Sequence, residues 1–290
     1  MRIDERLIAA RDFRPQRYVR MALGEKGIGW VRRADAERLR AWPEIFEFSE
    51  ERIFLRQLGE PALTSIFREV ARSLQCEGAI GGWRDETYAV HGAEGGEALF
   101  HIERAAMRLF GLTSSAAHLN GFVVQNENTA IWIARRAATK AIDPGMLDNL
   151  VAGGVSSGQD AWQTLLRESG EEAGIPVALA QRARPAGVLC VRHDVAEGLD
   201  SEILHIYDLA LPADFAPRNT DGEVSEFLSL DGWALLGRIA RGEMTVEAGL
   251  VATDFALRHG VIQDEDGKLA SLIEACRGPT PPGGARPWAA

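Results

Sequence analysis

The sequence predicts a mixed α/β (α+β) protein with a smaller α+β domain followed by a larger domain built around a β-sheet. Its 290 residues suffice for about two domains at roughly 150 residues each. The first part alternates helical patterns with short strand-like pieces, and near residue 116 the pattern changes to longer β-forming runs. We therefore expect domains at residues 1–115 and 116–262, followed by a C-terminal extension at 263–290.

Charge and composition exclude several classes of function. The formal net charge of -10 and the pI near 5.2 argue against binding to nucleic-acid phosphates, which needs clustered Lys and Arg. The sequence has neither a signal-peptide pattern nor a run approaching the ~20 apolar residues of a membrane span. The three cysteines are too far apart for a zinc site and too few for a disulfide framework. We expect a cytoplasmic protein that binds neither nucleic acid nor membranes.

The first domain is expected to contain three helices and two strands. Helical patterns cover residues 33–42, 62–75 and 98–112, and strand-like pieces cover 52–58 and 86–92. These segments suggest a small α+β unit. Their residues indicate no particular chemistry.

The second domain opens with a predicted hairpin. HLNGFVVQ and AIWIARR are β-rich runs separated by the turn-forming residues NENT. Further strands are expected at 187–195, 201–211 and 226–230, and helices at 233–242 and 245–260. The chain ends in RGPTPPGGARPWAA, whose proline and glycine content predicts disorder.

An acidic helix is predicted between the hairpin and the later strands. Asp160 is a candidate N-cap with Gln163 three residues on, so a helix should begin at Ala161. Three glutamates then follow at spacing i, i+3 and i+4, so their like charges share one face and repel. A divalent cation, which prefers oxygen ligands, would offset that repulsion. A solvated acidic face is the alternative. The glutamates are Glu168, Glu171 and Glu172.

The stretch from Gly153 to Ile175 resembles the Nudix box, G-x5-E-x7-R-E-U-x-E-E-x-G-U, where U is a bulky aliphatic residue. Two positions depart from it: Gln159 stands at the first glutamate, and Ser169 at the first aliphatic position. The three later glutamates are all present. The resemblance implies a Nudix α/β/α sandwich with a mixed sheet, preceded by the smaller domain.

The resemblance also implies a metal site. Glu168, Glu171 and Glu172 would bind Mg²⁺, with Mn²⁺ as an alternative, and Arg167 would hold a carboxylate in place. Glu168, Glu171 and Arg167 would be the catalytic residues. Many members add a glutamate from a later loop, and we expect Glu223 in DGEVSEF to be that fourth ligand, with a solvated turn residue as the alternative.

Three residues before the box are candidates for substrate binding. Arg135 and Lys140 could meet substrate phosphates, although charged strand ends are usually solvated. Trp132 lies within a strand, where a tryptophan is most often part of the core, but its ring could stack on a flat heterocycle.

Segments between residues 100 and 262 resemble a Nudix subfamily with an extra N-terminal domain, related to the Nudix portion fused to thiamine pyrophosphokinase in some fungi. This implies hydrolysis of a small diphosphate, thiamine diphosphate or its oxidised derivatives, to a monophosphate and orthophosphate. A homodimer is also expected. The alternatives are a Nudix pyrophosphatase for ADP-ribose, dinucleotides or coenzyme A, and a non-catalytic Nudix-like binding module. An isoprenoid isomerase is disfavoured because Ala152 replaces that family's catalytic cysteine.

Overall fold

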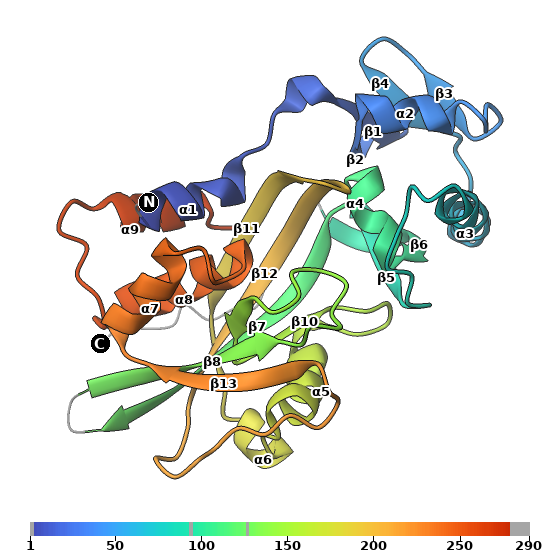
Figure 1. Ribbon diagram of the computed structural model, residues 1–290. Coiled ribbons are helices and arrows are strands. Elements are labelled where there is room, and N and C mark those ends of the chain that lie inside the picture. The colour runs from blue at the N-terminus through green and yellow to red at the C-terminus, as the bar shows by residue number, and fades with distance from the viewer. Residues whose placement is uncertain (1–2, 93–94, 126–127, 279–290) are drawn as a thin grey trace.

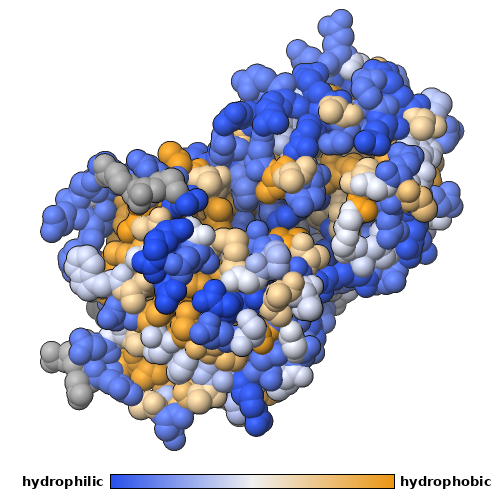
Figure 2. Space-filling view, viewed as in Figure 1, coloured by the Kyte–Doolittle hydropathy of each residue, from blue (hydrophilic) through white to orange (hydrophobic). Residues whose placement is uncertain are grey.

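The computed structural model describes residues 3–92, 95–125 and 128–278, and shows two lobes (Figure 1). The smaller lobe has its own buried core between Val19 and Leu112. The larger lobe is built around a seven-stranded sheet. Figure 2 shows that hydrophilic residues cover most of the visible surface of the smaller lobe.

The smaller lobe combines a four-stranded sheet in the order β2-β1-β4-β3 with a β5-β6 hairpin. Helix α3 packs on this hairpin, and the rings of Phe67 and Phe100 stack with centroids 4.2 Å apart. The elements are η2 (Pro15–Arg17), β1 (Tyr18–Leu23), β2 (Lys26–Arg32), α2 (Arg33–Leu39), β3 (Phe46–Phe48), β4 (Arg52–Leu55), α3 (Glu60–Cys76), β5 (Thr87–Gly92), β6 (Gly95–Glu103), η3 (Arg104–Ala106) and α4 (Met107–Phe110).

The sequence prediction was wrong over residues 98–112, where a single helix was expected. The first part of that range lies in strand β6, and only its end is helical, in η3 and α4. Phe100 and Ile102 are both buried while His101 between them is not, which is the period-2 pattern of a strand. Antiparallel pairing with β5 therefore overrides the local helical preference.

The larger lobe contains a mixed sheet in the order β11-β12-β7-β8-β13, with β10 added to β7 and β9 to β8. β12 runs parallel to β7, and the other pairs are antiparallel. The predicted hairpin and later strands are confirmed. The strands are β7 (Ser114–Gln125), β8 (Asn128–Arg136), β9 (Leu147–Asn149), β10 (Val151–Gly154), β11 (Arg184–Val195), β12 (Gly198–Ala210) and β13 (Val224–Leu230).

Helices cover both faces of this sheet, which confirms the predicted α/β/α sandwich. One buried core lies between the sheet and α5, around Leu165 and Leu119, and the other lies under α7 and α8, around Leu235 and Phe255. The helices are α5 (Ala161–Ala173), α6 (Val177–Ala180), α7 (Gly232–Ala240), α8 (Val246–Arg258) and α9 (Lys268–Ala275).

The first helical segment packs on the larger lobe, although its residues lie in the range expected for the first domain. α1 (Ile3–Leu7) and η1 (Ile8–Arg11) lie beside α9 in Figure 1. Leu7 and Ala10 are buried in the same core as α7 and α8. Burial of these apolar side chains gives the segment more stabilisation there than exposure beside the smaller lobe would.

A buried carboxylate joins the sheet to α8. Asp208 on β12 accepts hydrogen bonds from Arg258 at 2.5 Å and from Asn120 at 3.0 Å, and lies 3.0 Å from Nε2 of His259. Burial acts to raise the pKa of Asp208, but the hydrogen bonds from His259 and Arg258 outweigh it and lower that pKa. This network fixes the end of α8 to the sheet.

At the C-terminal end, Arg277 follows α9 and forms a β-bridge with Leu189. The remainder of the stretch predicted to be disordered, residues 279–290, lies outside the described residues. In the described part of the chain, no helix combines the length and the apolarity needed to cross a bilayer.

Candidate active site

The helix that carries the three glutamates begins where the sequence predicts. Asp160 caps α5 by accepting a hydrogen bond from the backbone N–H of Gln163 at 2.7 Å, while the side chain of Gln163 accepts from the N–H of Asp160 at 3.1 Å. This reciprocal capping box satisfies donors that the first turn of a helix leaves free. It sets the register of the glutamates relative to the sheet.

Arg167 contacts two of the three glutamates. One guanidinium nitrogen lies 2.8 Å from Glu168 and another donates to Glu171 at 2.7 Å. Glu171 is 45% exposed, whereas Glu172 is only 7% exposed and faces the sheet. The three carboxylates therefore lie in different environments, even though their spacing puts them on one side of the helix.

Glu172 is held between the helix and the sheet. It accepts a hydrogen bond from the backbone N–H of Ala152 at 2.9 Å and lies 3.9 Å from the Lys140 ammonium. Burial raises its pKa to about 8, and the charge of Glu168 adds to this. Burial likewise raises the pKa of Glu168. The site thus holds more buried carboxylate than its basic groups compensate, a condition that a bound cation would relieve.

Gly153 on β10 allows Glu168 to approach the sheet. A Cβ at this position would lie 2.4 Å from Cγ of Glu168, closer than real Cβ contacts. Any larger residue would displace the glutamate. The close approach of Glu168 to the sheet explains why glycine occupies the first position of the motif.

A loop before β13 brings Asp221 beside the glutamates. Asn219 donates to the backbone carbonyl of Glu172 at 3.3 Å and to Asp221 at 2.6 Å, and the N–H of Thr220 donates to the carbonyl of Glu171 at 2.9 Å. These bonds dock the loop on the C-terminal end of α5. Sequence reasoning did not select Asp221. Its position in TDGEV, two residues before the chosen Glu223, was the available signal.

Glu223, the expected fourth ligand, is ion-paired with Lys140 and lies 3.3 Å from a nitrogen of Arg84 in the smaller lobe. Burial acts to raise its pKa, but the hydrogen bond and charge of Lys140 outweigh this, and the pKa of Glu223 is lowered. Its charge contributes to the raised pKa of Glu168. Its role as a ligand stays a prediction.

The carboxylates fit a hard divalent cation. Oxygen atoms of Glu168, Glu171 and Asp221 lie within 4.8 Å of one another. All three groups offer carboxylate oxygens, the ligands that Mg²⁺ prefers. The raised pKa values of Glu168 and Glu172 point the same way, because a bound cation would favour the ionised carboxylates.

A cavity of about 300 Å³ lies between the two lobes. The smaller lobe contributes lining residues between Ala79 and Leu112, and the larger lobe contributes others between Ser114 and Glu247. Lys140, Ala152 and Gly154 place one wall of this cavity beside Glu172. The basic lining residues are Arg84, Arg104, Arg108, Arg136 and Lys140. A volume of this size suits a small organic ligand.

The three predicted substrate-binding residues lie in different places. Lys140 lines the cavity, whereas Arg135 and Trp132 are not among its lining residues. Arg135 is ion-paired with Glu226 at 2.7 Å. Trp132 packs against the apolar core under α5. The roles proposed for Arg135 and Trp132 stay predictions.

Gly154 brings the lobes into contact, and Gly154→Ala should weaken this junction. The new Cβ would lie 1.7 Å from Oη of Tyr88, which is buried in the smaller lobe. Overpacking of this kind costs about 1–3 kcal/mol, so the thermal midpoint should fall. Adding Tyr88→Phe to this variant should restore part of the lost stability. The change removes Oη and leaves Cζ, 2.8 Å from the new Cβ, as the nearest atom of the ring.

Gly170→Ala is the matched control for this prediction. A Cβ at Gly170 meets no atom within 4 Å, and the residue lies inside α5, where alanine favours helix by about 1 kcal/mol. Its midpoint should equal or exceed that of the wild type. If Gly154→Ala melted at the same midpoint as the wild type, the close contact between Gly154 and Tyr88 would be refuted.

Comparison with known proteins matches residues 5–114 to a family described as a domain of unknown function (DUF4743), and residues 120–249 to the NUDIX domain. The Arabidopsis thaliana protein named Nudix hydrolase 24, chloroplastic, is 34% identical over 265 residues, covering 90% of this chain and 73% of that protein. Nudix hydrolase 20, chloroplastic, of the same plant is 32% identical over 273 residues, with the same coverage. A crystal structure from Deinococcus radiodurans covers 66% of this chain and 99% of its own at TM-score 0.44 and 24% identity.

Proposed function

Because the chain belongs to the Nudix hydrolase family, we propose that this phosphohydrolase cleaves the diphosphate of thiamine diphosphate or its oxidised derivatives, with Mg²⁺ as its metal. The products would be orthophosphate and a monophosphate. The observation that carries the reaction type is the convergence of Glu168, Glu171 and Asp221. None of these three lines the cavity, and the link to its basic wall is Lys140, which lies 3.9 Å from Glu172. The thiamine part rests on the sequence resemblance.

Glu168, Glu171 and Asp221 would hold the divalent cation. Glu172, which is buried, stays a predicted ligand. When bound, such a cation neutralises phosphate oxygens and lowers the pKa of an attacking water. Arg167 keeps two of these carboxylates in place through its paired contacts. A carboxylate of this group would accept the proton that the water loses as its oxygen forms the new bond to phosphorus. The bond from that phosphorus to the bridging oxygen breaks, and the monophosphate leaves.

Lys140 and Arg84 would bind the substrate's phosphate oxygens. Both cations line the cavity, and both contact Glu223, so they converge from the two lobes. A substrate phosphate that enters between Lys140 and Arg84 would replace the carboxylate of Glu223 as their anionic partner. Their convergence orients the diphosphate toward the carboxylates on α5.

A phosphate-release screen with Mg²⁺ tests the proposal. It should cover thiamine diphosphate, its oxidised derivatives, ADP-ribose, a dinucleotide and coenzyme A, with added phosphatase to reveal products that retain phosphate. We expect the oxidised thiamine diphosphates to have the highest kcat/KM. A clearly higher value for ADP-ribose or a dinucleotide would overturn the substrate assignment and leave the reaction class intact. Absence of hydrolysis with every compound would favour a non-catalytic binding module.

Three further expectations stay predictions: the preference for Mg²⁺ over Mn²⁺, the homodimer and the cytoplasmic location. Repeating the screen with Mn²⁺ addresses the first. Sedimentation of the full chain addresses the second.

A further inference from the structure

The basic residues that line the cavity differ in how their charges are paired. Arg84 and Lys140 both contact one carboxylate, that of Glu223, which lies 3.3 Å from a nitrogen of Arg84. Lys140 also lies 3.9 Å from Glu172, a longer contact. The other three cations each have a close carboxylate of their own. These pairs are Arg104 with Glu86, Arg108 with Asp200 and Arg136 with Asp148. Arg84 and Lys140 therefore depend on one close carboxylate between them.

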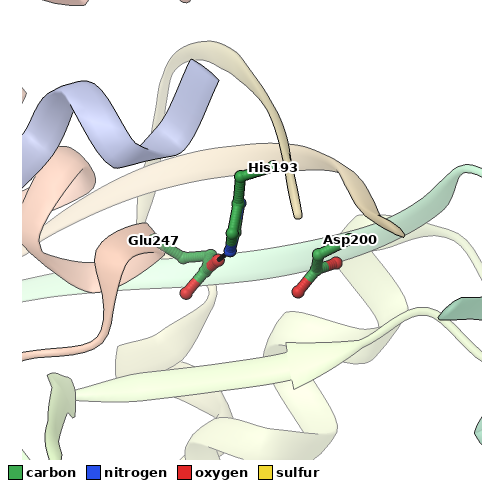
Figure 3. Close-up of side chains that lie close together, drawn as sticks. All are labelled: His193, Asp200 and Glu247. Atoms are coloured by element: carbon green, nitrogen blue, oxygen red, sulfur yellow. Dashed lines mark ion pairs between the residues drawn. The ribbon is translucent and has the colours of Figure 1, made fainter. Parts of the chain in front are cut away.

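Negative charge gathers on another part of the cavity wall. Asp200 and Glu247 both line the cavity, and together with His193 they point toward one another in Figure 3. One ligand atom from each of the three lies within 4.8 Å of the others. Carboxylates this close together repel a phosphate, which makes the neighbouring Arg108 a poor phosphate site. A phosphate group in this cavity is better placed at Arg84 and Lys140.

Glu223 reaches these two cations from a loop whose backbone is held independently of the side chain. Its N–H donates to Asp221 at 2.8 Å, and its carbonyl oxygen accepts from the N–H of Ala137 at 2.9 Å. The side chain is 35% exposed. Because neither backbone bond involves the Glu223 carboxylate, the side chain can rotate toward solvent while the loop stays in place.

The contacts of Glu223 also connect the two lobes. Arg84 lies between α3 and β5 in the smaller lobe, whereas Lys140 lies between β8 and β9 in the larger lobe. A phosphate group carries the same sign of charge as the carboxylate and offers oxygen acceptors to the same two cations. The two anions would compete, because both need the space between Arg84 and Lys140 and their charges repel.

We propose that Glu223 is a built-in competitor for the phosphate site, whose carboxylate pairs with Arg84 and Lys140 in the free protein and must leave before a substrate phosphate binds. This inference rests on the proposed function, since it takes these two cations as the phosphate site. Displacing the carboxylate costs free energy, which weakens the binding of every phosphate ligand, products included. Glu223 therefore limits how tightly a phosphate-bearing product is retained after cleavage.

The test measures pyrophosphate binding to the full chain by titration calorimetry in EDTA, so that no divalent cation takes part. Glu223→Gln keeps the size of the side chain and removes the competing charge. Its Kd for pyrophosphate should be lower than that of the wild type by about fivefold or more, and its Kd for orthophosphate by a similar factor. A residue that only binds a metal ion or only supports the fold would leave both values unchanged or raise them.

Glu243→Gln is the matched control. Glu243 also pairs with two cations, Arg238 and Arg241, and is 31% exposed, but none of these three residues lines the cavity. Its Kd for pyrophosphate should equal that of the wild type. Adding Arg84→Gln to Glu223→Gln should remove most of the gain in affinity, because the double variant lacks one of the two cations that would hold pyrophosphate.

Thermal melts in EDTA provide a second measurement and check that each variant folds. Without pyrophosphate, Glu223→Gln should melt slightly below the wild type, because it loses ion pairs that connect the lobes. Pyrophosphate should then raise the midpoint of Glu223→Gln more than that of the wild type, since a tighter ligand stabilises the folded state more.

The outcomes separate this inference from the proposed function. Equal or weaker pyrophosphate binding by Glu223→Gln, including binding too weak to measure in both proteins, would overturn the inference and leave the proposed function to the phosphate-release screen. A gain in affinity that survives Arg84→Gln would also overturn it, because pyrophosphate would then bind elsewhere. A gain that Arg84→Gln removes, without hydrolysis of any diphosphate in the screen, would support the inference and defeat the proposed function.

Discussion

Glu171→Gln is expected to lower kcat/KM by on the order of 10² to 10⁴ while the protein folds as well as the wild type. The side chain keeps its size and loses the charge that, with Glu168 and Asp221, would hold the cation. The change also removes the 2.7 Å ion pair with Arg167, but at 45% exposure such a pair is worth about 0–1 kcal/mol. Relief of repulsion among the glutamates opposes this small loss. Stability and activity should therefore respond differently.

Thermal melts with and without Mg²⁺ complete this test. A ligand that binds only the folded state raises the midpoint by mass action, so Mg²⁺ should raise the wild-type midpoint and raise that of Glu171→Gln less. Glu274→Gln makes the same chemical change at an 81% exposed position on α9 and should match the wild type in both assays. If Glu171→Gln hydrolyses substrate within about twofold of the wild type and Mg²⁺ shifts all melts equally, Glu171 is a solvated surface charge and does not hold the cation.

Asp208→Ala is expected to destabilise the protein by about 3 kcal/mol, the low end for removing one partner of a buried ion pair. The variant loses the hydrogen bonds from Arg258 and Asn120, although Arg258 keeps its 2.7 Å pair with Asp254. For a domain of this size the midpoint should fall by about 6–12 °C. Since Asp208 does not line the cavity, kcat per folded molecule should change little.

The measurement for Asp208→Ala is a thermal melt near pH 7. The pKa of Asp208 is lower in the folded state, so its contribution is fully present above the unfolded pKa and is lost as pH falls through the folded pKa, below the usual value of 3.8. Asp214→Ala, at an exposed loop position, is the control and should melt within about 1 °C of the wild type. A shift for Asp208→Ala no larger than the control's would show that the network is dispensable.

Local patterns predicted most elements of the larger lobe because their signals lie within a few residues of one another. The capping residues Asp160 and Gln163 placed the start of α5 correctly, since a capping box is formed within four residues. Residues 98–112 were assigned wrongly because their apolar spacing also fits a helix, and only pairing with β5 decides for a strand. Strands β1, β2 and β3 were not predicted. β1 and β2 form a hairpin, as do β3 and β4, and the sheet is completed only by the parallel pairing of β1 with β4, which a local pattern does not show.

The candidate site also combines features that follow from local sequence with features that depend on contacts between distant segments. The spacing of Glu168 and Glu171 predicts that both lie on one side of the helix, because i, i+3 and i+4 positions share a helix face wherever the helix lies, and the metal site inferred from it stays a prediction. Asp221 could not be ranked above Glu223 from sequence. Which loop carboxylate reaches α5 depends on bonds that Asn219 and Thr220 make to the end of that helix.

The sequence by itself determined the family motif, the helix that carries the glutamates and the excess of carboxylate on it, all of which follow from spacing along one segment. Tertiary structure alone decided that Glu172 is buried beside Lys140, that Tyr88 meets Gly154, and that a cavity forms between the lobes. Contacts between distant segments depend on how whole elements pack. Burial then raises the pKa of carboxylates such as Glu202 and Glu247, because desolvation acts only once those segments have come together.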